Sequence, residues 1–148
     1  MNKIILMMLL ALSALQAQEY KVIFDCSSGD AHYVKSRMWL VGKTMDMIEK
    51  RGEKVDVALT LHGSCVPMVS KEFDMVVADE DVAEIQKAQE YLIALSKRGN
   101  VKIIACAMSL ASNAIETDEV LKFIEISPNS FIDTIAYQNS GYAIMTFK

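Results

Sequence analysis

The sequence predicts a three-layer α/β/α domain with a mainly parallel five-stranded sheet. Apolar runs of strand length alternate with longer segments whose apolar residues recur at helical spacing. This order is typical of a parallel sheet that is covered by helices on both faces. The links are short, and no internal repeat, low-complexity tract or linker interrupts them. A length of 148 residues suits one such domain and is too short for two.

Residues 1–17 have the pattern of a secretory signal peptide and are not part of this domain. Lys3 is followed by the apolar run IILMMLLAL and then by the small and polar residues SALQAQ. The apolar run is shorter than the ~20 residues that a membrane-spanning helix needs. We therefore predict cleavage after Ala17, a mature domain at residues 18–148 with no membrane span, and a periplasmic location.

The charge balance argues against two classes of partner. The formal net charge is −4, and removal of Lys3 with the signal peptide makes it about −5. Such a protein has no electrostatic reason to bind nucleic acid or anionic lipid. We expect neither of them as a partner.

The first strand and helix are predicted at the start of the mature chain. The strand Tyr20–Cys26 ends in the turn residues SSGD, where Ser28 or Asp30 can cap the next helix. That helix ends at Arg51 and Gly52. Its predicted buried residues recur at helical spacing: Val34, Met38, Val41, Met45 and Ile48.

A second strand and helix follow. Val55–Leu61 predicts the strand, and Met68–Ala78, the least regular segment, is interpreted as a loop. Acidic residues at Asp79–Asp81 favour the start of a helix that closes at Gly99. The apolar side of this helix carries Val82, Ile85, Leu92 and Leu95.

The third unit is a strand that ends at Cys106 and passes directly into a short helix. Val101, Ile103 and Ile104 predict a buried strand, and Ala107–Ala114 predicts the helix. A brief turn is expected at residues 117–119.

The last part of the chain completes the sheet. Phe123–Ile126 is predicted as a fourth strand and Tyr142–Phe147 as the fifth. Ser127 followed by Pro128 favours a helix start, and that helix runs to Gly141. We expect its inward residues to be Phe131, Ile132, Ile135 and Ala136.

The predicted sheet brings three cysteines to one edge. Cys26, Cys65 and Cys106 lie at or just beyond the carboxyl ends of the first three strands, where open α/β sheets bind ligands. Asp25 and His62 share this edge. The set is compatible with a nucleophilic thiol and supporting groups, a disulfide with a spare thiol, or a metal site. The metal site has least support, because no pair has the close spacing of a zinc site, and we predict neither metal nor cofactor.

Cys106 is the first candidate for chemistry. A cysteine just before a helix faces unpaired backbone N–H groups and the positive end of the helix dipole, and both favour the thiolate. The alternative is a small buried hydrophobe. His62 could orient the thiol or take its proton, or it could simply be hydrogen-bonded in its loop. Asp25 could be a general base or a helix cap. The predicted site residues are Cys106, Cys65 and His62.

Export would bring the three cysteines into an oxidising compartment, and an odd number leaves at least one unpaired in the chain. Cys65 follows Gly63 and Ser64 in a flexible turn, whereas Cys26 ends a strand. We predict a reversible Cys65–Cys106 disulfide with Cys26 buried and unreactive.

Several of these segments resemble one known family. VKIIACAMSLASNAI and FIEISPNSFIDTIAYQNSGYAIM are similar to the end of DsrE/DsrF-like proteins, in particular the small exported single-domain branch. YKVIFDCSSGD and VALTLHGSCVPMV, with His62 and Gly63 after the second strand, match its start. The resemblance covers nearly all of the mature chain.

The resemblance implies a flavodoxin-like domain that assembles as homotrimers or homohexamers. Cys106 matches the cysteine that carries a persulfide between partner proteins in the sulfur-relay members, so a sulfur donor or acceptor protein is expected. Those members are cytoplasmic, unlike an exported chain. We thus expect a periplasmic persulfide carrier or sulfurtransferase-like protein. The alternative is a non-catalytic oligomeric module that binds a small ligand and has structural cysteines.

Overall fold

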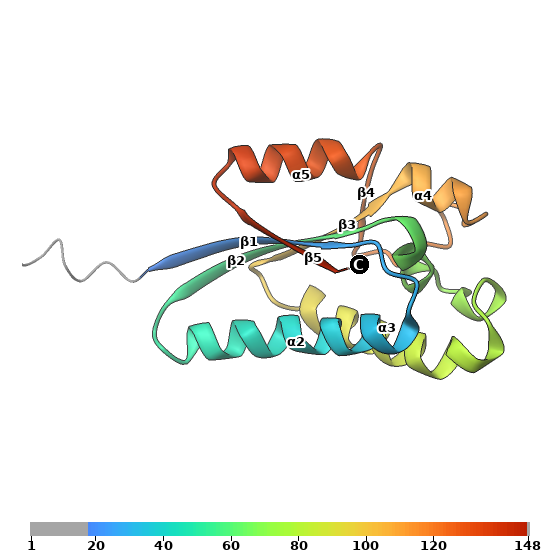
Figure 1. The fold of residues 1–148 in the computed structure, drawn as a ribbon, viewed down its shortest axis with the longest axis horizontal. Helices are drawn as coiled ribbons and strands as arrows, with labels where there is room; N and C mark the ends of the chain where they lie inside the picture. Colours follow the sequence, from blue (N-terminus) through green and yellow to red (C-terminus); the bar gives the residue numbers. More distant parts are fainter. Residues whose placement is uncertain (1–17, 148) are drawn as a thin grey trace, which may run out of the picture.

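The computed structural model describes residues 18–147, which form a five-stranded sheet between two layers of helices (Figure 1). The strand order is β4-β3-β2-β1-β5, and all neighbouring strands are parallel. The strands are β1 (Glu19–Cys26), β2 (Lys54–Leu61), β3 (Val101–Cys106), β4 (Glu125–Ser127) and β5 (Ala143–Phe147). The predicted fold class is confirmed. The predicted signal peptide lies outside the described residues.

Two long helices cover one face of the sheet (Figure 1). These are α2 (Ala31–Glu49) and α3 (Val82–Ser96), which pack against each other. Asp30 caps α2 by accepting a hydrogen bond from the Tyr33 N–H at 2.8 Å. The predicted inward face of α2 is confirmed, with four residues fully buried: Val34, Met38, Val41 and Met45. Within residues 18–147, no helix has the length and apolar character to cross a bilayer.

Successive residues of the strands alternate between the two faces of the sheet. The core beneath α2 and α3 contains three residues in register across β1, β2 and β3: Cys26, Leu61 and Ala105. The opposite face carries the residues just before these, again in register: Asp25, Thr60 and Ile104. The helix α5 (Ser130–Asn139) covers this second face (Figure 1).

The connections differ in part from the predictions. The segment after β2 forms short 3-10 turns, η2 (Gly63–Val69), η3 (Phe73–Met75) and η4 (Asp79–Asp81), although most of it was expected to be a loop. β4 lies slightly later than the predicted strand Phe123–Ile126. The cap of α5 is Asn129, not Ser127, because the Asn129 side chain accepts a hydrogen bond from the Phe131 N–H at 2.9 Å.

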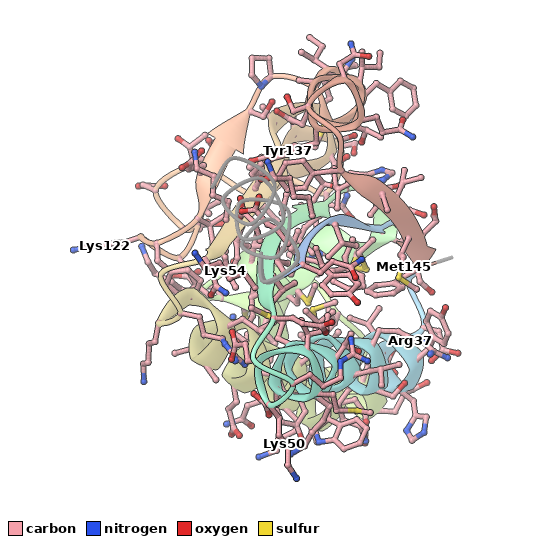
Figure 2. All side chains as sticks on the ribbon, turned by 90° about the vertical axis from the view of Figure 1, so that its left-hand side faces the viewer. Arg37, Lys50, Lys54, Lys122, Tyr137 and Met145 are labelled. Carbon is pink, nitrogen blue, oxygen red and sulfur yellow. A yellow bond between two sulfur atoms is a disulfide. The ribbon has the colours of Figure 1, made fainter. Side chains whose placement is uncertain are left out.

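Helix α5 is turned the opposite way from the prediction. Phe131, Ile132 and Ile135 are 68%, 60% and 59% exposed, and Ala136 is exposed too. Its less exposed side carries Ser130, Asp133, Thr134 and Tyr137. Figure 2 shows Tyr137 between the helix and the sheet. The prediction was wrong because the sheet face beneath α5 carries polar groups such as Asp25 and Thr60, so the helix packs its polar side there.

Candidate functional site

Cys106 lies where β3 passes into the short helix α4 (Ala107–Ser112). It is both the last residue of β3 and the residue that precedes the first turn of α4. In register it pairs with Ser127 of β4, and it is 4% exposed. Because Ala105 faces the core beneath α2 and α3, the Cys106 side chain points to the opposite face, beneath the start of α5.

Two serines surround the Cys106 sulfur. Burial by itself would raise the pKa of this thiol, but hydrogen bonds from the backbone and side chain of Ser130 and of Ser109 outweigh burial. The pKa of Cys106 is therefore held below its ordinary value. Donors aimed at the sulfur favour the thiolate over the thiol, which makes Cys106 a better nucleophile at neutral pH.

Ser109 also connects the thiol to the loop that follows β2. The Gly63 N–H donates to the Ser109 hydroxyl oxygen at 2.9 Å, and the Asn113 side chain donates to the Gly63 carbonyl at 3.3 Å. Gly63 has φ of +54°, a conformation that favours glycine. The position of Gly63 therefore supports the hydroxyl that contacts the Cys106 sulfur.

His62 lies in the same cluster of polar residues around Cys106. Its Nε2 is 3.0 Å from Asp25 Oδ1, and Thr60 Oγ1 donates to the same oxygen at 2.8 Å. The hydrogen bond to Asp25 raises the pKa of His62, burial opposes this, and the charges of Asp25 and of Cys106 add to the rise. An imidazolium beside the thiol would in turn favour the thiolate.

The other two cysteines form a disulfide with each other. Cys26 and Cys65 are joined, with their Cα atoms 5.9 Å apart, and Cys106 is free. The predicted Cys65–Cys106 pair is wrong. Cys26 lies beneath α2 and α3, where Cys65 also packs in the core, whereas Cys106 follows Ala105 by one residue and points to the other face.

The structure thus brings together two of the three predicted site residues, Cys106 and His62, and directs the Cys65 side chain into the core beneath α2 and α3, where it is bonded to Cys26. Asp25, which was expected at this edge, contacts His62 directly. Between residues 18 and 147, no group of three His, Cys, Asp or Glu side chains is arranged to hold a metal ion.

Sequence reasoning missed Ser109 and Ser130. Ser109 could have been found, because a serine three residues after a helix-capping position is placed to reach back to it, as in a capping box. Ser130 could not, because it reaches Cys106 only through the packing of α5 on the sheet.

Comparison with known proteins agrees with this architecture. The sequence model of the DsrE/DsrF-like family matches residues 21–147, which is almost the whole described domain. The chain belongs to the DsrE/DsrF-like family. This family match includes every residue of the site around Cys106.

One curated protein is similar in sequence to this DsrE/DsrF-like chain. An uncharacterized protein of Aquifex aeolicus (strain VF5) is 30% identical over 131 residues, which are 88% of this chain and 57% of that protein. The chain thus spans little more than half the length of this curated relative.

Two solved structures are similar to this one. The protein of unknown function MTH1491 from Methanobacterium thermoautotrophicum has a TM-score of 0.62 and 17% identity, covering 86% of this chain and 99% of that one. The ychN protein from E. coli has a TM-score of 0.58 and 17% identity, covering 89% and 100%. At this identity the likeness concerns the fold alone.

Proposed function

We propose that this DsrE/DsrF-like protein carries sulfane sulfur as a persulfide on Cys106 and passes it to an acceptor protein. The observation that carries the proposal is the free Cys106 thiol, whose pKa is lowered by hydrogen bonds from Ser130 and Ser109. These donors stabilise the thiolate, which is the form that attacks sulfur. The role that the family resemblance implies for Cys106 points the same way.

The loading step can be written with inorganic polysulfide as the donor. The Cys106 thiolate attacks the terminal sulfur of the polysulfide, and a new S–S bond forms. The S–S bond between that sulfur and the rest of the polysulfide breaks, and the polysulfide leaves one sulfur shorter with the electron pair of the broken bond. Because Cys106 is only 4% exposed, a small donor of this kind suits the site.

Intact-mass spectrometry tests the loading step. The mature protein, incubated with polysulfide and then desalted, should gain the mass of one sulfur atom, and dithiothreitol should remove it. Cys106→Ser should gain nothing, and peptide mapping should place the added sulfur on Cys106 and leave Cys26 and Cys65 bonded. Added sulfur only on Cys26 or Cys65 would contradict the proposal.

A second candidate is a non-catalytic module whose cysteines are structural. The burial of Cys106 and the Cys26–Cys65 bond favour it. A Cys106 that neither takes up sulfur nor reacts with iodoacetamide at neutral pH would support this function over the first one.

The proposal includes export to the periplasm and assembly as a homotrimer or homohexamer. The pattern of residues 1–17 supports export, as does a disulfide that an oxidising compartment would preserve. The outward apolar side of α5 supports assembly, because large exposed apolar patches mark interaction sites. Mass analysis of the protein from its own compartment should show a chain that begins at or near Gln18.

A further inference from the structure

Thr60 and His62 both contact the Asp25 carboxylate on the face of the sheet that α5 covers. Thr60 donates to Oδ1 at 2.8 Å, and His62 Nε2 lies 3.0 Å from the same oxygen. Thr60 is fully buried, and the side chains of Asp25 and His62 are 15% and 18% exposed. Hydrogen bonds sheltered from water in this way are strong and fix the geometry of their members.

This contact decides which nitrogen of His62 titrates. An ionised carboxylate only accepts hydrogen bonds, so the hydrogen between the two side chains belongs to His62 Nε2. Nδ1 is then the nitrogen that gains and loses a proton. A carboxylate that fixes the tautomer of an imidazole is also what prepares histidine for general base work in hydrolase triads.

His62 and Cys106 lie next to each other at the ends of neighbouring strands. Leu61 is in register with Ala105, and His62 and Cys106 are the residues that follow them. Neighbouring strands are about 4.8 Å apart. The His62 backbone stays extended, with φ of −147° and ψ of 178°, so its side chain points to the same face as Cys106.

We propose that Asp25, braced by Thr60, is a positioning residue that holds the His62 imidazole beside Cys106, so that Nδ1 receives the thiol proton. The proton moves from the Cys106 sulfur to Nδ1, a thiolate and an imidazolium result, and no other bond changes. The inference rests on the proposed function, in which Cys106 is the reacting thiol.

Among the residues that the structure describes, few other charged groups near His62 could act in the place of Asp25. β1 contributes Asp25, β3 contributes Cys106, and both raise the pKa of His62. The loop side of α4 meets Gly63 with the uncharged Ser109 and Asn113. α5 presents Ser130 and, one turn further along, Asp133, whose Oδ2 is buried without a hydrogen-bond partner among the described residues. Asp133 is therefore included in the test.

Proton NMR titration of the histidine rings measures the effect directly, because the chain has two histidines. His62→Gln assigns the signals, and His32, whose side chain is 79% exposed, is an internal reference. Asp25→Asn should lower the pKa of His62 by about one unit or more. Two control variants remove a carboxylate elsewhere: Asp133→Asn on α5 and Asp56→Asn at the far end of β2. Both should leave the pKa of His62 within a few tenths of a unit of its value in the parent protein.

Alkylation of Cys106 provides the second measurement. In Asp25→Asn the profile of rate against pH should move to higher pH, and the rate at pH 7 should fall about three- to tenfold, because one pKa unit is a factor of ten in the thiolate fraction. A merely structural role of Asp25 would change the unfolding transition without moving either titration. Thr60→Val should shift the His62 titration and the Cys106 alkylation profile in the same direction as Asp25→Asn, but by less. Thr60→Ser should give the same two titrations as the parent protein.

The possible outcomes separate this inference from the proposed function. Unchanged titrations of His62 and Cys106 in Asp25→Asn would overturn the inference, whether or not Cys106 carries sulfur. A shift in both, with no uptake of sulfur, would overturn the proposed function alone. If Asp25→Asn does not fold, Thr60→Val decides: a lowered His62 pKa supports the inference, and an unchanged one overturns it.

Discussion

Removal of one serine hydroxyl, on Ser130 or Ser109, is the smallest change that tests the lowered pKa of the Cys106 thiol. Ser130→Ala or Ser109→Ala removes a donor to the Cys106 sulfur, so the pKa of Cys106 should rise and its alkylation at pH 7 should slow several-fold. A hydrogen bond to a charged group contributes about 1.5–3 kcal/mol, which sets the upper range of this effect. Rates with iodoacetamide over a pH series measure it. Ser140→Ala, an exposed hydroxyl at the end of α5, is the control and should react like the parent.

The raised pKa of His62 predicts a pH dependence of stability. The hydrogen bond to Asp25 raises this pKa from its ordinary value of 6.5, although burial opposes the rise. A group whose pKa is higher in the folded chain adds stability that is full below its unfolded pKa and is lost as the pH rises through its folded pKa.

Urea unfolding in a Cys106→Ser background, where the thiol does not titrate, measures this contribution. The loss of unfolding free energy in His62→Gln should be greater at about pH 5.5 than at about pH 8. A loss that grows with pH would mean that His62 is neutral when folded.

Single residues also show how far the sequence predicts the site. Asp25, His62 and Cys106 could be placed at one edge because each lies at or next to the end of a predicted strand. The cysteine pairing could not, because it depends on the face to which each side chain points. A difference of one residue at a strand end, between Ala105 and Cys106, reverses that face.

At the scale of elements, α2 carries much of the apolar packing of the domain. Met38 is fully buried, so Met38→Asp places an unpaired carboxylate in the core and should destabilise the domain by several kcal/mol or unfold it. Lys43, on the exposed side of the same helix, should tolerate alanine within about 0.5 kcal/mol. Denaturant titration compares the two. Similar stability of both variants would contradict the observed face of α2.

The helices differ in how well their orientation could be predicted. In α2 the apolar stripe faces the sheet, as the spacing of its residues indicates. In α5 an equally clear apolar stripe faces away from the sheet of its own chain. Periodicity identifies the side of a helix that is apolar. It does not identify the surface that covers that side, and this is why the same reasoning was right for α2 and wrong for α5.

The outward stripe of α5 predicts an effect on assembly. Phe131→Asp or Ile135→Asp should weaken the proposed homo-oligomer, because each puts a charge into an apolar contact. Light scattering after size-exclusion chromatography should show a lower mass than for the parent. Met47→Asp is a matched control, since Met47 is 69% exposed but lies on α2, which covers the opposite face of the sheet. An unchanged mass for both α5 variants would exclude this helix from the interface.

At the scale of the whole molecule, the disulfide closes a large part of the chain into a loop. Cys26 and Cys65 are 39 residues apart, and α2 and β2 lie between them. Constraining the unfolded chain over such a loop stabilises the fold by about 4 kcal/mol in the chain-entropy estimate. The Cys26→Ser, Cys65→Ser double variant should lose roughly 2–4 kcal/mol of unfolding free energy.

Denaturant titrations with and without reductant separate the disulfide from other effects. Reductant should lower the stability of the parent and leave the double variant unchanged. A parent protein that is insensitive to reductant under conditions that break the bond would contradict this contribution.

The alternation of residues along the strands places the disulfide and the free thiol on opposite faces of the sheet. The oxidised pair is on the side of α2 and α3, the thiol is on the side of α5, and the hydrogen-bonded backbone of the sheet lies between them. The chain has three cysteines, and the two that could form an intramolecular disulfide with Cys106 are already joined to each other. Oxidation that joins Cys26 to Cys65 therefore leaves Cys106 with no other cysteine of its own chain to pair with. In the proposed function, sulfur carried on Cys106 would pass only to another molecule.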